Sequence, residues 1–202
     1  MTTEEMIESL KPSVLLLRLP GGTGTGFLIS ERGHLLTCNH VVLGEMVTVQ
    51  SCTGKVWAVG VLARERACDL AVLQIEEPEA RPLCFADPAD IVEGQTVFAL
   101  GHPMGLDFAV SRGIISSRDH VSKGVSYVKT DAALNPGSSG GPIINSRGEV
   151  IGIADWVVSQ SQGFGFAVAV RYVLALAARL RIPVRRAVAF REAPPEAGAP
   201  GS

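Results

Sequence analysis

Short apolar runs separated by turn residues fill the chain from residue 14 to residue 168. Runs rich in Val, Leu and Ile follow one another in the first half, at 14–19, 25–29, 34–37, 46–50, 56–63 and 70–75. The second half repeats the pattern, at 96–100, 108–116, 127–130, 142–145, 150–155 and 165–168. Regular short strands with glycine-containing turns favour a β-sandwich or barrel. The pattern therefore predicts an all-β protein made of two six-stranded units.

Three segments depart from this strand pattern. Residues 76–94 are acidic and rich in proline, which predicts a connection between the two halves, with Leu83 and Phe85 anchoring it to a core. Residues 172–180 carry apolar side chains at helical spacing, which predicts a C-terminal amphipathic helix. Residues 4–10 are compatible with a short leading helix.

Composition and charge exclude several classes of protein. The 202 residues are 47% hydrophobic and 19% charged, which is an ordinary globular balance. The net charge of −2 and the lack of a basic run argue against a nucleic-acid partner. No apolar run approaches the roughly 20 residues that span a bilayer, and the polar N-terminal residues do not resemble a signal peptide. We therefore expect a cytoplasmic protein without a membrane partner, and the Ala/Arg/Gly-rich composition suits a bacterium.

The cysteines give no sign of a metal site. They are Cys38, Cys52, Cys68 and Cys84, and none forms a C-x-x-C pair, so the sequence predicts no zinc site. Without a secretion signal, free buried thiols are favoured over disulfides.

A glycine-rich segment offers a candidate nucleophile. Residues 131–142 read DAALNPGSSGGP, and Ser139 lies at the tip of the predicted turn. Glycines let the chain turn sharply and let a substrate backbone approach. The N–H groups beside Ser139, those of Gly137 above all, are suited to receive an oxyanion. An ordinary Gly/Ser loop is the alternative interpretation of this segment alone.

A base and an acid occur in the order that such a nucleophile needs. His40 follows the apolar run at 34–37, and Asp69 begins the run at 70–75. A buried acid needs a partner, and a histidine N–H is suitable because the acid then fixes the imidazole tautomer. The order His40, Asp69, Ser139 is that of chymotrypsin. A cleft between the two units would bring the three side chains together.

Six blocks of sequence then support one resemblance. They are GTGFLI (24–29), GHLLTCNHVV (33–42), DLAVLQI (69–75), ALGHPMGL (99–106), TDAALNPGSSGGP (130–142) and GFAV (165–168). With these blocks the chain resembles the protease domain of the HtrA/Deg serine proteases, within the trypsin-like superfamily. The likeness runs from about residue 4 to residue 180.

The resemblance implies a fold and an activity. It implies a chymotrypsin-like double six-stranded β-barrel with a C-terminal helix. It also implies a serine endopeptidase that hydrolyses polypeptides through an acyl-enzyme intermediate, without cofactor or metal. His40 would be the general base, Asp69 its orienting acid and Ser139 the nucleophile. The oxyanion hole would be formed at Gly137, Ser138 and Ser139.

The expected boundaries follow from the pattern and the resemblance together. One protease domain is expected over residues 1–186. Its parts are a first barrel at about 12–76, a linker at about 77–94, a second barrel at about 95–169 and the helix at about 170–181. Residues 187–202 are rich in Glu, Pro, Ala and Gly and are expected to be a disordered tail.

Departures from the family pattern leave alternatives open. HtrA proteins usually carry a PDZ domain after the protease, and we expect none here. The resemblance also implies a trimer, and control by an activating partner is the alternative. The chain could then be a protease-like effector or a protein-binding module whose site is unformed until a partner binds. Cys38 stands two residues before His40, where the family often has Asn, and we hypothesise that its oxidation disturbs the base.

The specificity pocket is partly legible by resemblance. Its floor would lie at Ala133, six positions before the nucleophile and next to Leu134, and it carries no charge. Its wall would include Asp155, Trp156 and Val157. These residues predict cleavage after small or medium aliphatic side chains, although Asp155 would also lie close to either the pocket or the triad acid.

The remaining histidines are interpreted as structural. His102 lies in a turn of the family pattern, and His34 and His120 are expected at the surface or in turns.

Overall fold

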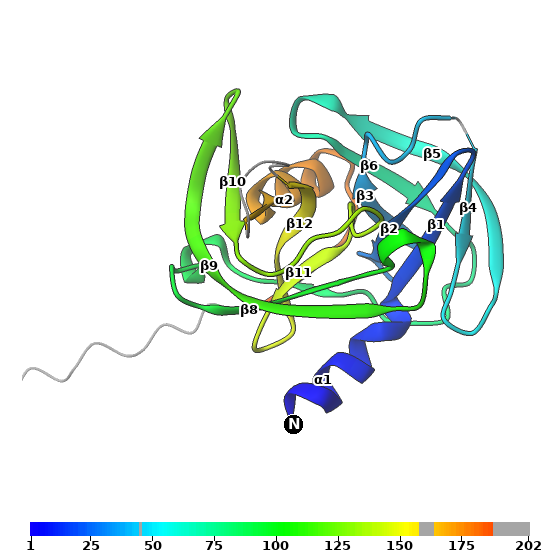
Figure 1. The fold of residues 1–202 in the computed structure, drawn as a ribbon. Helices are drawn as coiled ribbons and strands as arrows, with labels where there is room; N and C mark the ends of the chain where they lie inside the picture. The colour runs from blue at the N-terminus through cyan, green and yellow to red at the C-terminus, as the bar shows by residue number, and fades with distance from the viewer. Residues whose placement is uncertain (45, 158–163, 188–202) are drawn as a thin grey trace, which may run out of the picture.

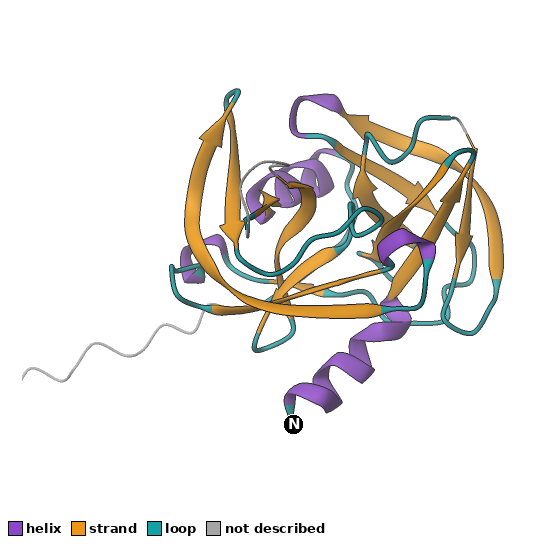
Figure 2. Ribbon diagram, in the orientation of Figure 1, coloured by secondary structure: helices purple, strands orange, loops and turns teal. Residues whose placement is uncertain are grey.

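Two β-barrels side by side make up the molecule (Figures 1 and 2). The computed structural model describes residues 1–44, 46–157 and 164–187. The expected tail after residue 187 lies outside the described residues. The predicted all-β double barrel with a C-terminal helix is confirmed.

The first barrel closes in the strand order β1-β2-β3-β6-β5-β4. Its strands are β1 (Val14–Leu19), β2 (Gly22–Leu28), β3 (His34–Cys38), β4 (Met46–Gln50), β5 (Val56–Glu65) and β6 (Leu70–Gln74). All residues of β3 are buried, as are those of β6 up to its last residue. These two strands therefore read as continuous apolar runs, because both of their faces are covered.

The second barrel has the order β11-β8-β9-β10-β13-β12 and closes through pairing of β11 with β12. Its strands are β8 (Thr96–Gly101), β9 (Ala109–Ser122), β10 (Val125–Thr130), β11 (Pro142–Asn145), β12 (Glu149–Val157) and β13 (Gly165–Ala169). Two short strands that the sequence did not predict, β7 (Cys84–Phe85) and β14 (Arg185–Arg186), extend this sheet by parallel pairing beside β12.

The connection between the barrels is packed against both of them. Leu83 and Phe85 are buried, as predicted, and the Leu83 N–H donates to the Leu28 carbonyl of the first barrel at 2.9 Å. The Phe85 ring lies 6.3 Å from that of Phe27, centroid to centroid. The connection thus ties the second barrel to the first.

Helices lie at the two ends of the chain, as expected. The helix α1 (Thr3–Leu10) begins with a capping box between Thr2 and Glu5, and its Met6 side chain is buried beside Gly148 of the second barrel. The helix α2 (Val170–Arg179) buries its apolar face on the second barrel. Short 3₁₀ turns occur at Lys11–Ser13, Arg66–Cys68, Pro88–Asp90 and Pro103–Gly105. No helix among the described residues has the length and apolar character needed to cross a membrane.

Two expectations about single residues need correction. The four cysteines are free thiols, but Cys52 is exposed, because it lies in the turn between β4 and β5. His34 is not at the surface: it begins β3, is buried, and its Nδ1 lies 2.6 Å from the Ser30 hydroxyl. The preceding turn thus provides the polar partner that a buried imidazole requires.

Candidate active site

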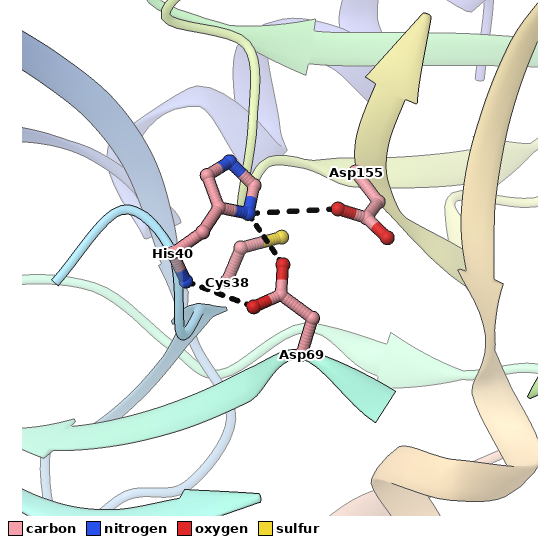
Figure 3. Close-up of side chains that lie close together, drawn as sticks. All are labelled: Cys38, His40, Asp69 and Asp155. Carbon is pink, nitrogen blue, oxygen red and sulfur yellow. Dashed lines mark hydrogen bonds and ion pairs between the residues drawn. The ribbon is translucent and has the colours of Figure 1, made fainter. Parts of the chain in front are cut away.

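The antiparallel pairing of β3 with β6 places His40 beside Asp69. Cys38 at the end of β3 pairs with Leu70 at the start of β6, so the residues just beyond them leave the barrel at the same edge. The Asp69 carboxylate accepts hydrogen bonds from the His40 backbone N–H at 2.9 Å and from the imidazole Nδ1 (Figure 3). This contact keeps the proton on Nδ1 and leaves the Nε2 lone pair free to act as a base.

The loop that carries His40 is held by an arginine that the sequence analysis missed. The Arg64 guanidinium donates to the Asn39 side-chain oxygen at 2.9 Å. It also donates to the backbone carbonyls of Val42 at 2.6 Å and Gly44 at 2.8 Å. A planar fork of donors suits this role because it reaches several acceptors at once. Nothing in the sequence near Arg64 marks it, because the contacts exist only after β5 has paired.

The nucleophile loop, between β10 and β11, is attached to the first barrel through Thr25. The Thr25 N–H donates to the Ser139 carbonyl at 2.9 Å, and its hydroxyl donates to the Gly137 carbonyl at 2.7 Å. Gly140 has a φ of +85°, and a Cβ there would lie 2.2 Å from the Thr25 carbonyl oxygen. Only glycine therefore fits at this position. Thr25 lies in the sequence block at 24–29, which was a signal that could have found it.

The Ser139 hydroxyl donates to the backbone carbonyl of Asp155 at 3.0 Å. Among the described residues it makes no hydrogen bond with His40. Nucleophile and base are both present, but the hydrogen bond between them is not formed in this conformation.

The turn around Ser139 presents backbone donors. Gly137 has a φ of +94°, a conformation that favours glycine. The Ser138 N–H donates to the Asn135 carbonyl at 2.9 Å and is engaged within the turn. The N–H groups of Gly137 and Ser139 donate to no acceptor within the described part of the chain. These two N–H groups are therefore available to an incoming oxyanion.

Asp155 reaches the site through an irregularity in β12. The pairing of β12 with β13 shifts register between Ala154 and Trp156, which leaves Asp155 as the extra residue of a bulge. Its buried carboxyl group lies 3.6 Å from His40 Nδ1 (Figure 3). The sequence left open whether Asp155 faces the pocket or the triad acid. The structure places its carboxyl group against the acid.

Charge and burial set the protonation states of these groups. The hydrogen bond with Asp69 raises the pKa of His40 against the opposing effect of burial, and the charges of both aspartates add to the rise. Burial alone would raise the pKa of Asp69, but its contacts with His40 outweigh this and lower it. Burial, followed by the charge of Asp69, raises the pKa of Asp155 to about 7. The two carboxyl groups therefore share a proton near neutral pH.

Cys38 lies beneath the triad. Its buried thiol donates to the Ala154 carbonyl at 3.3 Å. Burial, with the nearby charges of Asp155 and Asp69, raises the pKa of this thiol well above its ordinary value. A protonated, buried thiol is a poor nucleophile, which weakens the hypothesis of oxidative control. Donor atoms of Cys38, His40, Asp69 and Asp155 all lie within 4.8 Å of one another, so these residues could hold a metal ion.

The other residues predicted for the site are placed only in part. Ala133 is exposed, and its carbonyl accepts a hydrogen bond from the Ser111 hydroxyl at 2.7 Å. Leu134 is buried against Gly165. The side chains of Trp156 and Val157 lie outside the described part of the structure.

His102 is structural, as predicted. It is buried, its backbone N–H donates to the Thr25 hydroxyl at 3.0 Å, and its carbonyl lies against Gly137.

Comparisons with known proteins agree with this architecture. The family model described as "Trypsin-like peptidase domain" matches residues 24–153. The putative serine protease HhoB of Synechocystis sp. is 39% identical over 159 residues, which are 74% of this chain and 38% of that protein. A probable periplasmic serine endoprotease of Hahella chejuensis, DegP-like, is 36% identical over 146 residues, covering 70% of this chain and 31% of the relative. The chain thus spans less than two fifths of these relatives' length.

Solved structures show the same likeness. The structure titled "HtrA-type protease AlgW with tripeptide" has a TM-score of 0.82 and 28% sequence identity, and the match covers 90% of this chain and 64% of that one.

The predicted cytoplasmic location is wrong. DegP-like relatives are named as periplasmic proteases, which points to a compartment outside the cytoplasm. The prediction rested on the polar N-terminal residues of this sequence. A folded protease domain does not itself state its compartment, because cellular addresses are carried by segments distinct from the fold.

The family match extends over well over half of the chain and includes His40, Asp69 and Ser139. The relatives and the solved structure are all serine proteases by name. The chain therefore belongs to the trypsin-like peptidases, and within them it is similar to the HtrA/Deg serine proteases.

Proposed function

We propose that this chain is a serine endopeptidase that cleaves polypeptides through an acyl-enzyme intermediate. The observation that carries the proposal is the convergence of base and nucleophile on one residue. The Asp155 carboxyl group lies 3.6 Å from the His40 imidazole, and the Asp155 carbonyl accepts the Ser139 hydroxyl at 3.0 Å. A change of the Ser139 rotamer is the movement needed to bring its hydroxyl to the base. Catalytic hydrogen bonds often tighten only when substrate binds.

The reaction then follows from the roles of the side chains. The His40 Nε2 takes the proton of the Ser139 hydroxyl as its oxygen attacks the scissile carbonyl. The N–H groups of Gly137 and Ser139 stabilise the oxyanion of the tetrahedral intermediate. His40 then gives its proton to the leaving amine, and water, activated by the same imidazole, hydrolyses the acyl-enzyme. Asp69 holds the imidazole in place and stabilises its charged form throughout.

The substrate specificity is part of the same proposal. Ala133 carries no charge to pair with Arg or Lys, so we expect cleavage after small or medium aliphatic residues. A peptide library measures this preference directly. Dominant cleavage after Arg or Lys would contradict it.

Labelling with a fluorophosphonate probe tests the proposed mechanism. We expect the wild type to be labelled, and the Ser139→Ala and His40→Ala variants to remain unlabelled. Ser146→Ala, which alters an exposed serine in the turn between β11 and β12, is the matched control and should be labelled like the wild type. A folded wild type that takes up no probe would refute a formed catalytic site.

A second candidate function rests on the hydrogen bond from Ser139 to the Asp155 carbonyl. In this alternative, the chain is a protease-like effector or binding module whose site forms only when a partner binds. The labelling rate of the isolated chain, compared with its rate in cell extract, separates the two candidates. A large increase in extract supports the second, and equal rates support the first.

A homotrimer is proposed by resemblance alone. Ile7 and Leu10 of α1 remain partly exposed and are available for such an interface, whereas Met6 is buried in its own chain.

A further inference from the structure

We propose that Cys38, His40, Asp69 and Asp155 form a Zn²⁺ site beneath the triad, and that bound zinc disables the catalytic base. The first half of this inference concerns binding and is independent of any activity. The second half rests on the proposed function.

Four separate parts of the fold bring the donor atoms together. Cys38 ends β3, His40 lies in the loop after it, Asp69 precedes β6, and Asp155 is the bulged residue of β12. In Figure 3 the four side chains point into one small space. Their donor atoms lie within 4.8 Å of one another. Tetrahedral zinc, with bonds of about 2.0–2.3 Å, separates its ligand atoms by about 3.3–3.8 Å. Movements of about an ångström would complete the site.

The chemistry of the donors favours zinc over other common divalent ions. One sulfur, one imidazole nitrogen and two carboxylate oxygens form a mixed set of the kind that zinc accepts. Calcium and magnesium require oxygen ligands and would not use the sulfur. Sequence spacing predicted no zinc site because the ligands are not paired along the chain. The barrels bring them together only after folding.

The site has a buried floor and an open side. Cys38 and Asp155 are buried, whereas the His40 side chain is 47% exposed and that of Asp69 is 25% exposed. An ion can therefore reach the donors past His40 without unfolding of either barrel. A His–Asp–Ser triad alone provides two of the ligands. Cys38 and Asp155 supply the other two and make this site particular to the present chain.

Zinc binding and base catalysis exclude each other at His40. The metal takes the lone pair of Nδ1, which in the catalytic tautomer carries the proton donated to Asp69. A neutral imidazole keeps one N–H, so its proton moves to Nε2. Nε2 then has no lone pair with which to accept the Ser139 proton. Cys38 releases its thiol proton to solvent and binds as the thiolate.

Cobalt titration of the chelator-treated full chain tests the binding site directly. Co²⁺ replaces Zn²⁺ and gives an intense thiolate-to-metal absorption band when sulfur is a ligand. We expect this band in the wild type and in Ser139→Ala, and its loss in Cys38→Ser. Cys84→Ser alters a partly buried cysteine outside the cluster and should keep the band. Asp155→Ala should keep the band but require at least about tenfold more metal, since even outer partners of a site contribute that much.

The outcomes separate the two halves of the inference. No band in the wild type, or a band that persists in Cys38→Ser, would overturn the site. The Asp155→Ala result decides the matter if Cys38→Ser does not fold. Zinc should also suppress fluorophosphonate labelling of the wild type. A cobalt band without any suppression would overturn the switch alone. A wild type that never labels refutes the proposed peptidase, while the cobalt result still decides the binding site.

Discussion

Asp155 shows how much a single residue can contribute to this site. Its carbonyl oxygen accepts the Ser139 hydroxyl, while its carboxyl group faces His40 and Asp69. Both contacts depend on the bulge in β12, because a regular strand would turn the side chain to the other face. The residue therefore connects the resting position of the nucleophile with the electrostatics of the base.

Removing the Asp155 charge should move the pH dependence of catalysis. His40 must be neutral to act as a base, so activity rises with pH through the His40 pKa, which the Asp69 hydrogen bond and both carboxylate charges raise. In metal-free enzyme we expect Asp155→Asn to shift the acidic limb of kcat/KM to lower pH. The pH profile of peptide cleavage measures this. A limb that stays in place or moves to higher pH would contradict the prediction.

His102 should make the fold sensitive to acid. Burial lowers its pKa from 6.5 to about 4, and its Nδ1 has no hydrogen-bond partner among the described residues. Below pH 6.5 the unfolded chain binds a proton that the folded chain refuses, so stability falls as the pH drops from 6.5 towards 4. The loss at pH 4 should reach about 3 kcal/mol. Urea unfolding at several pH values should show a weaker acid dependence in His102→Asn, and parallel losses in both proteins would refute the assignment.

At the scale of elements, the predicted strands match the observed ones because most of them carry continuous runs of Val, Leu and Ile. The strands β7 and β14 escaped prediction because each has two residues and exists only through its partners. The far end of β9 escaped because it is polar and mostly exposed. The order of the triad residues was legible for a similar reason, since each lies at a strand end or in a glycine-rich turn. Arg64 was not, because its acceptors are backbone carbonyls that fold beside it.

Arg64 should act as a positioning residue for the loop after β3. Arg64→Ala removes its hydrogen bonds to Asn39, Val42 and Gly44, so His40 loses its fixed position. We expect kcat to fall by about ten- to a hundredfold, with a smaller change in KM. Arg64→Lys should recover part of the loss, because lysine keeps the charge without the planar fork. Steady-state kinetics provide the measurement, and a loss of similar size in the exposed Arg66→Ala control would show that the effect is not specific.

At the scale of the whole molecule, Thr25 joins the barrels at the active site. Thr25→Val keeps the shape but removes the hydroxyl that donates to Gly137 and accepts from His102. We expect a destabilisation of about 2–4 kcal/mol, because partly buried backbone groups lose their partners. We also expect fluorophosphonate labelling to fall at temperatures where the variant is still folded. Thr48→Val, on the half-exposed face of β4, is the control. A Thr25→Val protein that labels at the wild-type rate would show that this link does not order the nucleophile.

The division of the triad between the barrels also sets a timetable. A ribosome delivers His40 and Asp69 early, within a barrel that can close before the second one is made. Ser139 follows much later, and the second barrel closes only when β12 has emerged to pair with β11. A nascent chain therefore carries an assembled base long before it has an ordered nucleophile. Cutting power arises last, when most of the chain that could be damaged has already folded.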